Sequence, residues 1–503
     1  MNDLNHLLFR RQYLFGTDPQ VFPEWKRISM PNGYQLTAHP DLNLSEYQGQ
    51  RFNFVLLGQI LDPLQPTFNN DQILNQFDKT AMDVESLFDL LYDKSGHYVL
   101  FVTSEDFMIV LNDAGGLKQV YYHQDEKGRI WLSSFAPLIA SQLNLPLSDE
   151  AQQYMSSSRY QEKIEPWWPG DFTPFHGVHH LYPNHYLNLK SFETVRFWPF
   201  KQLKRYSLKE GTRLAGDLLK GSCEAGNNRF DAIIAFTGGF DSRSILAASR
   251  SFADQVEGFS SIYRKLTSES QDIVISRSIA TKINMKYTLV ESNQEIPPEF
   301  LSVYDQSTQG YKTDWVNIVY GRYTNIPAEK VIFKGNITEI VRSAYWQYGD
   351  YPAEVSLETL MNKLNLGNNP AMRDGLREWM KDALYTEKLG YKLLDMFAWE
   401  VQTGSWAAMS HSIFGLTHEE FSPFGNRKLL EIMLGVHHRQ RVLPKATLQQ
   451  EMVRYLWPEL AVFPYHSSWN LSGYKKRFLD AALRNFFRKM RHKLKRQNDD
   501  RLV

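Results

Sequence analysis

Residues 237–242, with the sequence Thr-Gly-Gly-Phe-Asp-Ser, combine residue types that can hold a phosphate group. The two glycines allow the backbone to turn tightly and to approach an anion closely. A helix expected to start near Ser242, with Arg243 in its first turn, would direct N–H groups and its positive dipole at that anion. The hydroxyl groups of Thr237 and Ser242 are further donors. The carboxylate of Asp241 suits such a site when a divalent cation such as Mg²⁺ lies between it and the phosphates.

The same six residues also fit a glycine turn before a helix that Asp241 caps, which is a common arrangement. The Gly-Lys-Ser/Thr ending of a Walker phosphate loop is absent. The preceding run, residues 230–236, is almost continuously apolar, as is typical of a strand buried on both faces of a parallel sheet. This position after a buried strand favours the phosphate site.

From residue 205 onward, expected strands alternate with expected helices. The helices are expected at 207–220, from 242 onward and at 268–282, and the strands at 230–236, 256–263, 286–290 and 330–334. This alternation predicts a doubly wound parallel sheet, which binds ligands at the carboxyl ends of its strands. The chain from residue 352 onward is expected to be mostly helical.

The first third of the chain predicts an antiparallel β region with helical inserts. Strands are expected at 52–60 and at 97–103, the second meeting 107–111 across a turn at 104–106. Residues 119–123 and 130–132 flank a turn and predict a hairpin. Residues 173–199 are expected to form two short strands that lead out of this region.

Composition narrows the possible functions. The 503 residues suffice for two or three domains, and Lys+Arg and Asp+Glu are both 56, so no global charge favours nucleic acid or membrane. The single cysteine, Cys223, excludes an internal disulfide and a Cys-rich metal site, and we interpret it as incidental. The sequence shows neither a signal peptide nor a membrane span, so the cytoplasm is expected.

The 237–242 motif resembles the pyrophosphate loop of N-type ATP pyrophosphatases and, within them, of the asparagine synthetase family. Residues 110–122 and 133–134 are similar to part of that family's amino-terminal glutaminase-type domain. The resemblance implies an α+β, Ntn-hydrolase-like domain over residues 1–200. An α/β, doubly wound ATP pyrophosphatase domain with a helical carboxyl-terminal part would cover 205–470, and a basic helix or tail 471–503.

The family cleaves ATP between its α and β phosphates, so the resemblance implies ATP and Mg²⁺ as cofactors. Asp241 and Glu339 would be the catalytic and metal-holding residues, although Thr338 stands where the family has an aspartate. Glu339 also fits a helix-start carboxylate paired with Arg342. The residues implied to bind the nucleotide are Thr237, Gly238, Gly239, Asp241, Ser242, Phe259 and Gly335.

Two further segments resemble parts of the family's synthetase site. Residues 267–272 match a stretch that leads into a helix beside the nucleotide, and they also fit a helix start capped by Ser268. Residues 422–431 resemble the segment that closes the site. Within it, Asn426 and Arg427 are candidate substrate contacts or a solvated helix start.

The sequence also departs from the family. Position 2 is Asn2, where the family has a nucleophilic cysteine, and Leu57-Gly58-Gln59 stands where the family has an Asn-Gly. The amino-terminal domain is therefore expected to be a scaffold without glutaminase activity. Residues 463–469 lack the lysine that the family uses, so Lys445 and Lys475 are the two candidates for its replacement.

Residues 475–496 contain ten Lys or Arg and one acidic residue, Asp480, with apolar residues interleaved. They fit a basic amphipathic helix on an anionic membrane surface or a nucleic acid, or a terminal helix packed on the domain. The pairs His179-His180 and His437-His438 lack metal-ligand spacing and are interpreted as structural.

The expected function is that of an ATP-dependent amide ligase. It would adenylate a small-molecule, peptide or glycan carboxylate, release pyrophosphate and couple ammonia or an amine, without its own glutaminase. The alternatives are a glutamine-independent asparagine synthase, a tRNA-modifying enzyme, which the neutral charge balance disfavours, and a non-catalytic nucleotide-binding relative. No nucleic acid partner is expected, and the sequence does not identify the acid or the amine.

Overall fold

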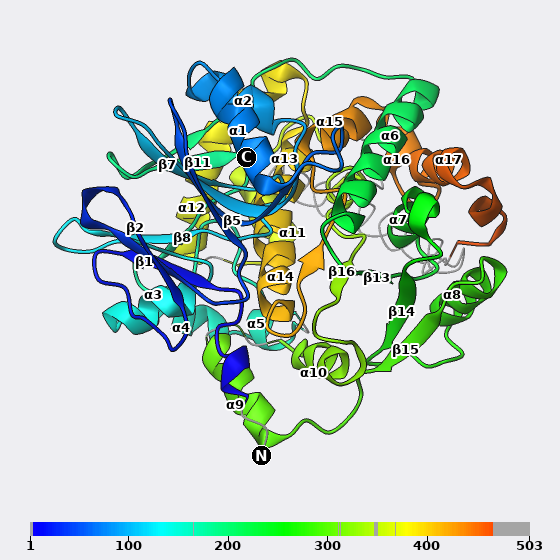
Figure 1. Cartoon of the computed structure of the whole chain (residues 1–503), viewed down its shortest axis with the longest axis horizontal. Helices are drawn as coiled ribbons and strands as arrows, with labels where there is room; N and C mark the ends of the chain where they lie inside the picture. The colour runs from blue at the N-terminus through cyan, green and yellow to red at the C-terminus, as the bar shows by residue number, and fades with distance from the viewer. Residues whose placement is uncertain are drawn as a thin grey trace, which may run out of the picture.

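The computed structural model describes residues 4–163, 165–309, 311, 313–346, 351–367 and 369–465. Its amino-terminal half contains two six-stranded sheets whose neighbouring strands pair antiparallel, drawn on the left of Figure 1. The first has the order β10 (His179–His180), β8 (Tyr121–Gln124), β9 (Ile130–Ser133), β1 (Tyr13–Gly16), β3 (Gln35–Ala38), β2 (Lys26–Ser29). The second has the order β12 (Glu193–Arg196), β11 (His185–Asn188), β7 (Met108–Asn112), β6 (Ser95–Thr103), β5 (Asn53–Leu61), β4 (Leu44–Gln48).

The two sheets pack face to face around one apolar core. Phe15 of β1 stacks on Phe101 of β6, with 5.5 Å between the ring centroids. The other face of the second sheet is covered by α1 (Asn70–Thr80) and α2 (Val84–Leu91), and Phe77 of α1 meets Phe54 of β5. Against the first sheet lies α3 (Ala136–Leu143), followed by α4 (Asp149–Met155) and α5 (Ser158–Gln161).

Most predicted strands of this half are confirmed. The strands expected at 52–60, 97–103 and 107–111 are β5, β6 and β7, and the predicted hairpin is β8–β9. The expectation for 173–199 was wrong, because three strands form there. The last two, β11 and β12, turn back as a hairpin at the edge of the second sheet, since the Asn188 side chain accepts the N–H groups of Lys190 and Ser191.

The carboxyl-terminal half is built on a five-stranded parallel sheet, drawn on the right of Figure 1. Its order is β15 (Tyr287–Glu291), β14 (Glu257–Ile262), β13 (Ala232–Ala235), β16 (Val331–Phe333), β17 (Glu420–Phe421). The chain proceeds outward from β13 to β15 and then crosses back to β16. The neighbours β13 and β16 therefore flank a topological switch point, the place where doubly wound sheets bind ligands.

Both faces of this sheet are buried, as the apolar run 230–236 predicts. Ile233 and Ile332 pack with Ile326 on one face, and Ile234 and Phe333 join the main core on the other. The helices associated with these strands are α6 (Leu208–Asn227), α7 (Phe240–Ala248), α8 (Gln271–Lys282), α9 (Pro298–Ser307) and α10 (Val316–Asn325). Two helix starts differ from the prediction, since α7 begins at Phe240 and α8 at Gln271. Ser268 is not the α8 cap, because Ser270 occupies that position.

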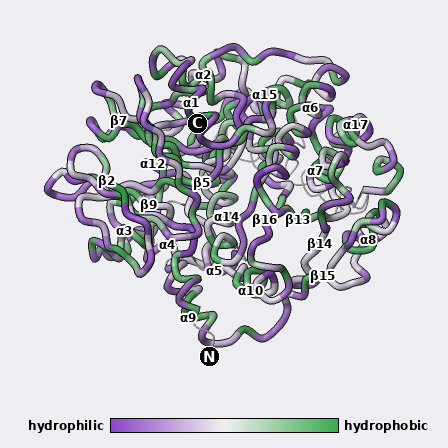
Figure 2. Tube along the Cα trace, viewed as in Figure 1, coloured by the Kyte–Doolittle hydropathy of each residue, from purple (hydrophilic) through white to green (hydrophobic). Residues whose placement is uncertain are grey.

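The rest of the described chain is mostly helical, as expected. It contains α11 (Leu357–Leu364), α12 (Pro370–Ala383), α13 (Leu393–Met396), a π-helical stretch (Phe397–Ala407), α14 (Ala408–Phe414), α15 (Arg427–Gly435), α16 (His438–Arg441) and α17 (Thr447–Leu456). Short 3₁₀ turns lie at Asn5–Leu7, Pro31–Gly33, Arg250–Phe252, Leu384–Leu389 and Pro458–Val462. Hydrophobic and hydrophilic residues are interspersed along both halves (Figure 2). None of the helices in the described ranges is long and apolar enough to cross a membrane. The basic segment 475–496 lies outside those ranges.

A buried polar network joins the two halves. Arg427, at the start of α15, donates from Nε to Asn184 Oδ1 at 2.9 Å, and Asn184 donates to Glu400 Oε1 at 3.1 Å. Glu400 also accepts from Arg196 at 2.8 Å. Arg427 and the helix cap Asn426 are almost fully buried, so neither expectation for them was correct. They form a buried helix start between the halves, and they do not line the candidate site described below.

Candidate functional site

The loop at residues 237–242 connects β13 to α7 at the carboxyl end of the central strand. Gly335, at the end of the neighbouring β16, packs directly against it. A Cβ atom on Gly335 would lie 2.6 Å from the backbone nitrogen of Ser242, closer than real contacts allow. Glycine at 335 is therefore needed for the two strand ends to meet at the switch point.

The donors of this loop are partly satisfied by the protein itself. Thr237 donates its N–H to Ser242 Oγ at 3.0 Å, and Gly238 donates its N–H to Asp272 Oδ1 of α8 at 2.7 Å. Asp272, which lies within the segment matched at 267–272, was not predicted as a site residue. Gly239 is the N-cap of α7, and Gly239, Asp241 and Ser242 line the pocket, so the start of this helix faces the pocket with its positive dipole end.

Arg243 lies behind the loop. It is fully buried and donates to the carbonyl oxygens of Gly238, Phe463 and Pro464 at 2.7–2.9 Å. Tyr465 packs 3.9 Å from its guanidinium and stacks on Phe240. Residues 463–465, the described part of the segment 463–469, thus pack behind the 237–242 loop.

Asp241 and Glu339 lie together, as expected for a shared metal site. Arg342 bridges them, with nitrogen–oxygen distances of 3.1 Å to Asp241 and 2.9 Å to Glu339. Gln449 donates to the other oxygen of Asp241. The alternative pairing of Glu339 with Arg342 is therefore also present, although residues 338–346 form turns instead of a helix.

The electrostatics of the carboxylate pair favour a cation. Burial raises the pKa of Glu339, Arg342 opposes this effect, and the nearby Asp241 raises the pKa further. Mg²⁺ in nucleotide sites is commonly held by one or two carboxylates and by substrate phosphates, so the donor set fits this ion once Arg342 is displaced. No group of three or more His, Cys, Asp or Glu side chains suits a metal anywhere in the described chain. Thr338 does not line the pocket, and its hydroxyl is buried without a partner.

Asp241, Glu339 and Gly335 line a pocket of about 360 Å³. All predicted site residues except Gly238 contribute to its wall, including Phe259 of β14. Lys445 does not line it, and Lys475 lies outside the described residues.

A charged group that sequence reasoning missed lies at the same strand ends. Lys334 lines the pocket next to Gly335 and pairs with the fully buried Glu420 at 3.1 Å, and Arg322 pairs with the same carboxylate at 2.7 Å. Burial lowers the pKa of Lys334, and Glu420 partly restores it. The position of Lys334 between a buried strand and a glycine was the sequence signal available for it.

The far side of the pocket is aromatic and was also missed. Trp315, Trp406 and Phe414 line it together with Glu165. Glu165 accepts from Trp406 Nε1 at 3.2 Å and pairs with Arg264 at 2.6 Å.

The other candidates lie apart from the pocket. Cys223 is buried in α6, and burial raises its thiol pKa to about 12. Gln59 accepts from Arg229 at 2.8 Å and so bonds the two halves, while Gly58 has φ +94° and no room for a side chain beside the His97 carbonyl. Asn2 lies outside the described residues.

The histidine pairs also lie outside the pocket wall. His180 is buried, which lowers its pKa to about 4, and His437 and His438 pack ring to ring at the start of α16.

The sequence matches no protein-family model and no curated protein. Solved structures show weak similarity. Glutamine phosphoribosylpyrophosphate amidotransferase from B. subtilis, complexed with ADP and GMP, is 10% identical over 68% of this chain and 73% of that chain, with a TM-score of 0.22. NMN synthetase from Francisella tularensis is 18% identical over 34% and 74%, with a TM-score of 0.19. The allosteric regulatory enzyme of purine biosynthesis is 9% identical over 72% and 74%, with a TM-score of 0.24. Similarity at this level does not assign a function.

Proposed function

We propose that the protein is an ATP-dependent amide ligase that activates a carboxylate as its adenylate. The observation that carries this proposal is the meeting of the 237–242 loop, Gly335 and the Asp241–Glu339 pair at the switch point of a parallel sheet. A phosphate-binding helix start and two carboxylates thus face one pocket of about 360 Å³.

In the proposed first step, a substrate carboxylate oxygen attacks the α-phosphorus of ATP. The bond from that phosphorus to the α–β bridging oxygen breaks, and pyrophosphate leaves. In the second step, ammonia or an amine attacks the acyl carbon and loses a proton, the bond from that carbon to the bridging oxygen breaks, and AMP departs with the bridging oxygen. Both steps move negative charge onto phosphate oxygens, so preset donors and cations accelerate them.

Each group has a proposed role. The hydroxyls of Thr237 and Ser242 and the N–H of Gly239 would receive the departing pyrophosphate. Mg²⁺, held by Asp241 and Glu339, would supply charge neutralisation for the phosphates.

Lys334 is the pocket lysine that we propose in place of the one missing from 463–469. Lys334 lines the pocket beside Gly335, and its ammonium group would stabilise negative charge on the acyl-adenylate. The substrates would be a small-molecule, peptide or glycan carboxylate and an amine donor, placed on the aromatic side. The amino-terminal half would serve as a scaffold.

A second candidate is a nucleotide-binding protein without catalysis. It is favoured by the internal hydrogen bonds of the 237–242 loop and by Arg342, which pairs with both carboxylates in the described structure. In this case ATP would bind without turnover.

The test is ATP–pyrophosphate exchange screened over carboxylic acids, with AMP, ADP and glutamate measured separately. The proposal expects acid-dependent exchange and AMP formation, without glutamate release from glutamine. Formation of ADP, or glutamate release, would contradict it. Calorimetry with Mg²⁺ and ATP on the wild type and Asp241→Asn tests the site itself, because equal binding by both or by neither would deny the loop carboxylate a role. ATP binding that depends on Asp241, without exchange or AMP formation for any acid, would favour the second candidate.

A further inference from the structure

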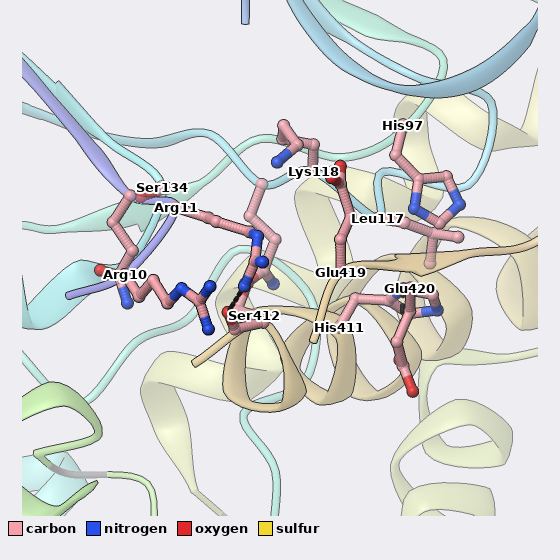
Figure 3. A pocket seen from close by; sticks show the side chains of 13 residues that line it. Arg10, Arg11, His97, Leu117, Lys118, Ser134, His411, Ser412, Glu419 and Glu420 are labelled. Carbon is pink, nitrogen blue, oxygen red and sulfur yellow. Dashed lines mark hydrogen bonds and ion pairs between the residues drawn. The ribbon is translucent and has the colours of Figure 1, made fainter. Parts of the chain in front are cut away.

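A second polar cavity, of about 50 Å³, lies between the two halves of the protein (Figure 3). Arg10, Arg11 and Gln12 reach it just before β1, and Lys118 and Gln119 reach it from the loop after β7. The other half contributes residues of α14 and β17. The cavity is separate from the candidate ATP pocket, although Glu420 stands in the wall between them and pairs with Lys334 on the pocket side.

The cations of this cavity have too few counter-charges. Arg10 pairs with Asp41 at 2.6 Å. Arg11 donates Nη1 to a neutral group, the Gly415 carbonyl, at 2.8 Å, and none of the described carboxylates forms an ion pair with it. Lys118 Nζ has neither a hydrogen bond nor an ion pair with the described residues. Glu420 is committed to Arg322 and Lys334, and the oxygens of Asp113 accept backbone N–H groups.

Glu419 is thus the one lining carboxylate left for both Arg11 and Lys118. Burial and the neighbouring Arg10 lower the pKa of Arg11 to about 10, and burial lowers that of Lys118 despite Glu419. A half-buried cation without a partner is costly, so a ligand that supplies negative charge would be bound there.

Two nearly fully buried amide side chains point to the same conclusion. Gln119 accepts from Ser412 Oγ at 2.7 Å through Oε1, which leaves its Nε2 buried without an acceptor. Gln12 Oε1 is buried without a donor. Buried polar atoms without hydrogen-bond partners destabilise the folded protein, so a group that fills the cavity and bonds to these atoms would recover part of the lost stability.

We propose that this cavity binds a small oxyanion between Arg11, Lys118 and the Nε2 amide of Gln119. The space corresponds to about four water molecules, which suits formate, acetate, bicarbonate or phosphate and excludes a nucleotide. An anion that keeps one hydroxyl, such as bicarbonate or hydrogen phosphate, would also donate to Gln12 Oε1. Acetate lacks that donor, so the two types of anion are distinguishable.

The test is thermal denaturation and calorimetry of the full chain with sodium acetate, bicarbonate or phosphate, against chloride at equal ionic strength. Wild type should bind at least one of these oxyanions with a low-millimolar or tighter Kd and show a raised midpoint. Lys118→Met should lose that response, with a midpoint in chloride at or above that of wild type because the unpaired cation is gone. The matched control is Lys201→Met, since Lys201 is 69% exposed, and it should respond like wild type.

A second variant, Gln119→Glu, places a carboxylate inside the cavity. It should also lose the response to oxyanions, and its thermal midpoint in chloride should be raised. A raised midpoint shows that this variant folds, so the loss of binding can be interpreted even if Lys118→Met folds poorly. Phosphate bound at the 237–242 loop would persist in both variants. The cavity is therefore judged by the part of the response that both variants lose. A response that neither variant reduces for any of the three anions, or a wild type that responds to none of them, would overturn the proposal. The result is independent of whether the protein activates carboxylates.

Discussion

Glu420 is the shared counter-charge of Arg322, which is buried, and of Lys334, which is partly buried, so replacing Glu420 with glutamine tests the ion pairs beside the pocket. The carboxylate is fully buried and lies 2.7 Å from Arg322 Nη1 and 3.1 Å from Lys334 Nζ. Glutamine keeps the size of the side chain but supplies a single acceptor oxygen and turns an NH₂ group toward the other cation. Removing one member of a buried ion pair costs about 3–5 kcal/mol, because it leaves an uncompensated charge.

We therefore expect Glu420→Gln to lower the free energy of unfolding by about 3–5 kcal/mol. The measurement is urea unfolding at pH 7, followed by tryptophan fluorescence and by far-UV circular dichroism. Removing one of the stranded cations should recover stability, so the double variant with Lys334→Met should show a coupling energy of about 0.5–3 kcal/mol. The control is Glu459→Gln, because the Glu459–Arg250 pair is about half exposed and should contribute less than about 1 kcal/mol.

The difference in the free energy of unfolding between wild type and Glu420→Gln should also depend on pH. The two cations lower the pKa of Glu420 below its ordinary value of 4.5, so its stabilisation is complete above that value. It is then lost as the pH falls through the lower pKa of the folded state. A loss below about 1 kcal/mol at pH 7, or a double variant no more stable than Glu420→Gln, would refute the assignment of Glu420 as the shared counter-charge.

Three other predictions follow from described contacts. Arg342→Met should raise the affinity for Mn²⁺ in the absence of ATP by about tenfold, because Asp241 and Glu339 lose the cation that bridges them. The measurement is electron paramagnetic resonance, which detects free Mn²⁺. An unchanged affinity would contradict a metal site shared by the two carboxylates. Glu339→Gln should lose Mg²⁺–ATP binding in calorimetry yet melt at or above the wild-type temperature. Since the pKa of Glu339 is raised, this thermal advantage should vanish below about pH 4.5 and grow as the pH rises through the folded-state pKa. Cys223, with a pKa of about 12, should not react with a thiol reagent at pH 8 until urea unfolds the chain, and rapid native labelling would show that α6 opens locally.

The elements that position the site could be predicted because local patterns encode them. The continuous apolar run at 230–236 and the alternation of strands and helices after it correspond to a buried parallel sheet. The glycines beside these strand ends indicated tight backbone turns, and Gly335 is indeed in contact with the loop. The family resemblance implied that Asp241 and Glu339 share one site, and they meet because the adjacent parallel strands β13 and β16 end at one edge.

What could not be predicted depends on partners far apart in the sequence. Arginine is usually a surface residue, yet Arg427 is buried, because its Nε donates a hydrogen bond to Asn184, which lies 243 residues away in the sequence. Lys334 and Glu420 are 86 residues apart, and no periodicity links them. Short strands such as β17, with two residues, are also too small to leave a pattern. Tertiary contacts of this kind decide burial after the local elements have formed.

The network of Arg427, Asn184, Arg196 and Glu400 has a consequence for attempts to divide the protein. Expressed alone, the carboxyl-terminal half would present Glu400 and Arg427 on a freshly exposed apolar surface, and the amino-terminal half would present Arg196 without its partner. Each fragment would therefore be prone to aggregate. The two halves are therefore not interchangeable modules. Selection against aggregation of the carboxyl-terminal half would preserve the amino-terminal half, whether or not the amino-terminal half has any chemistry of its own.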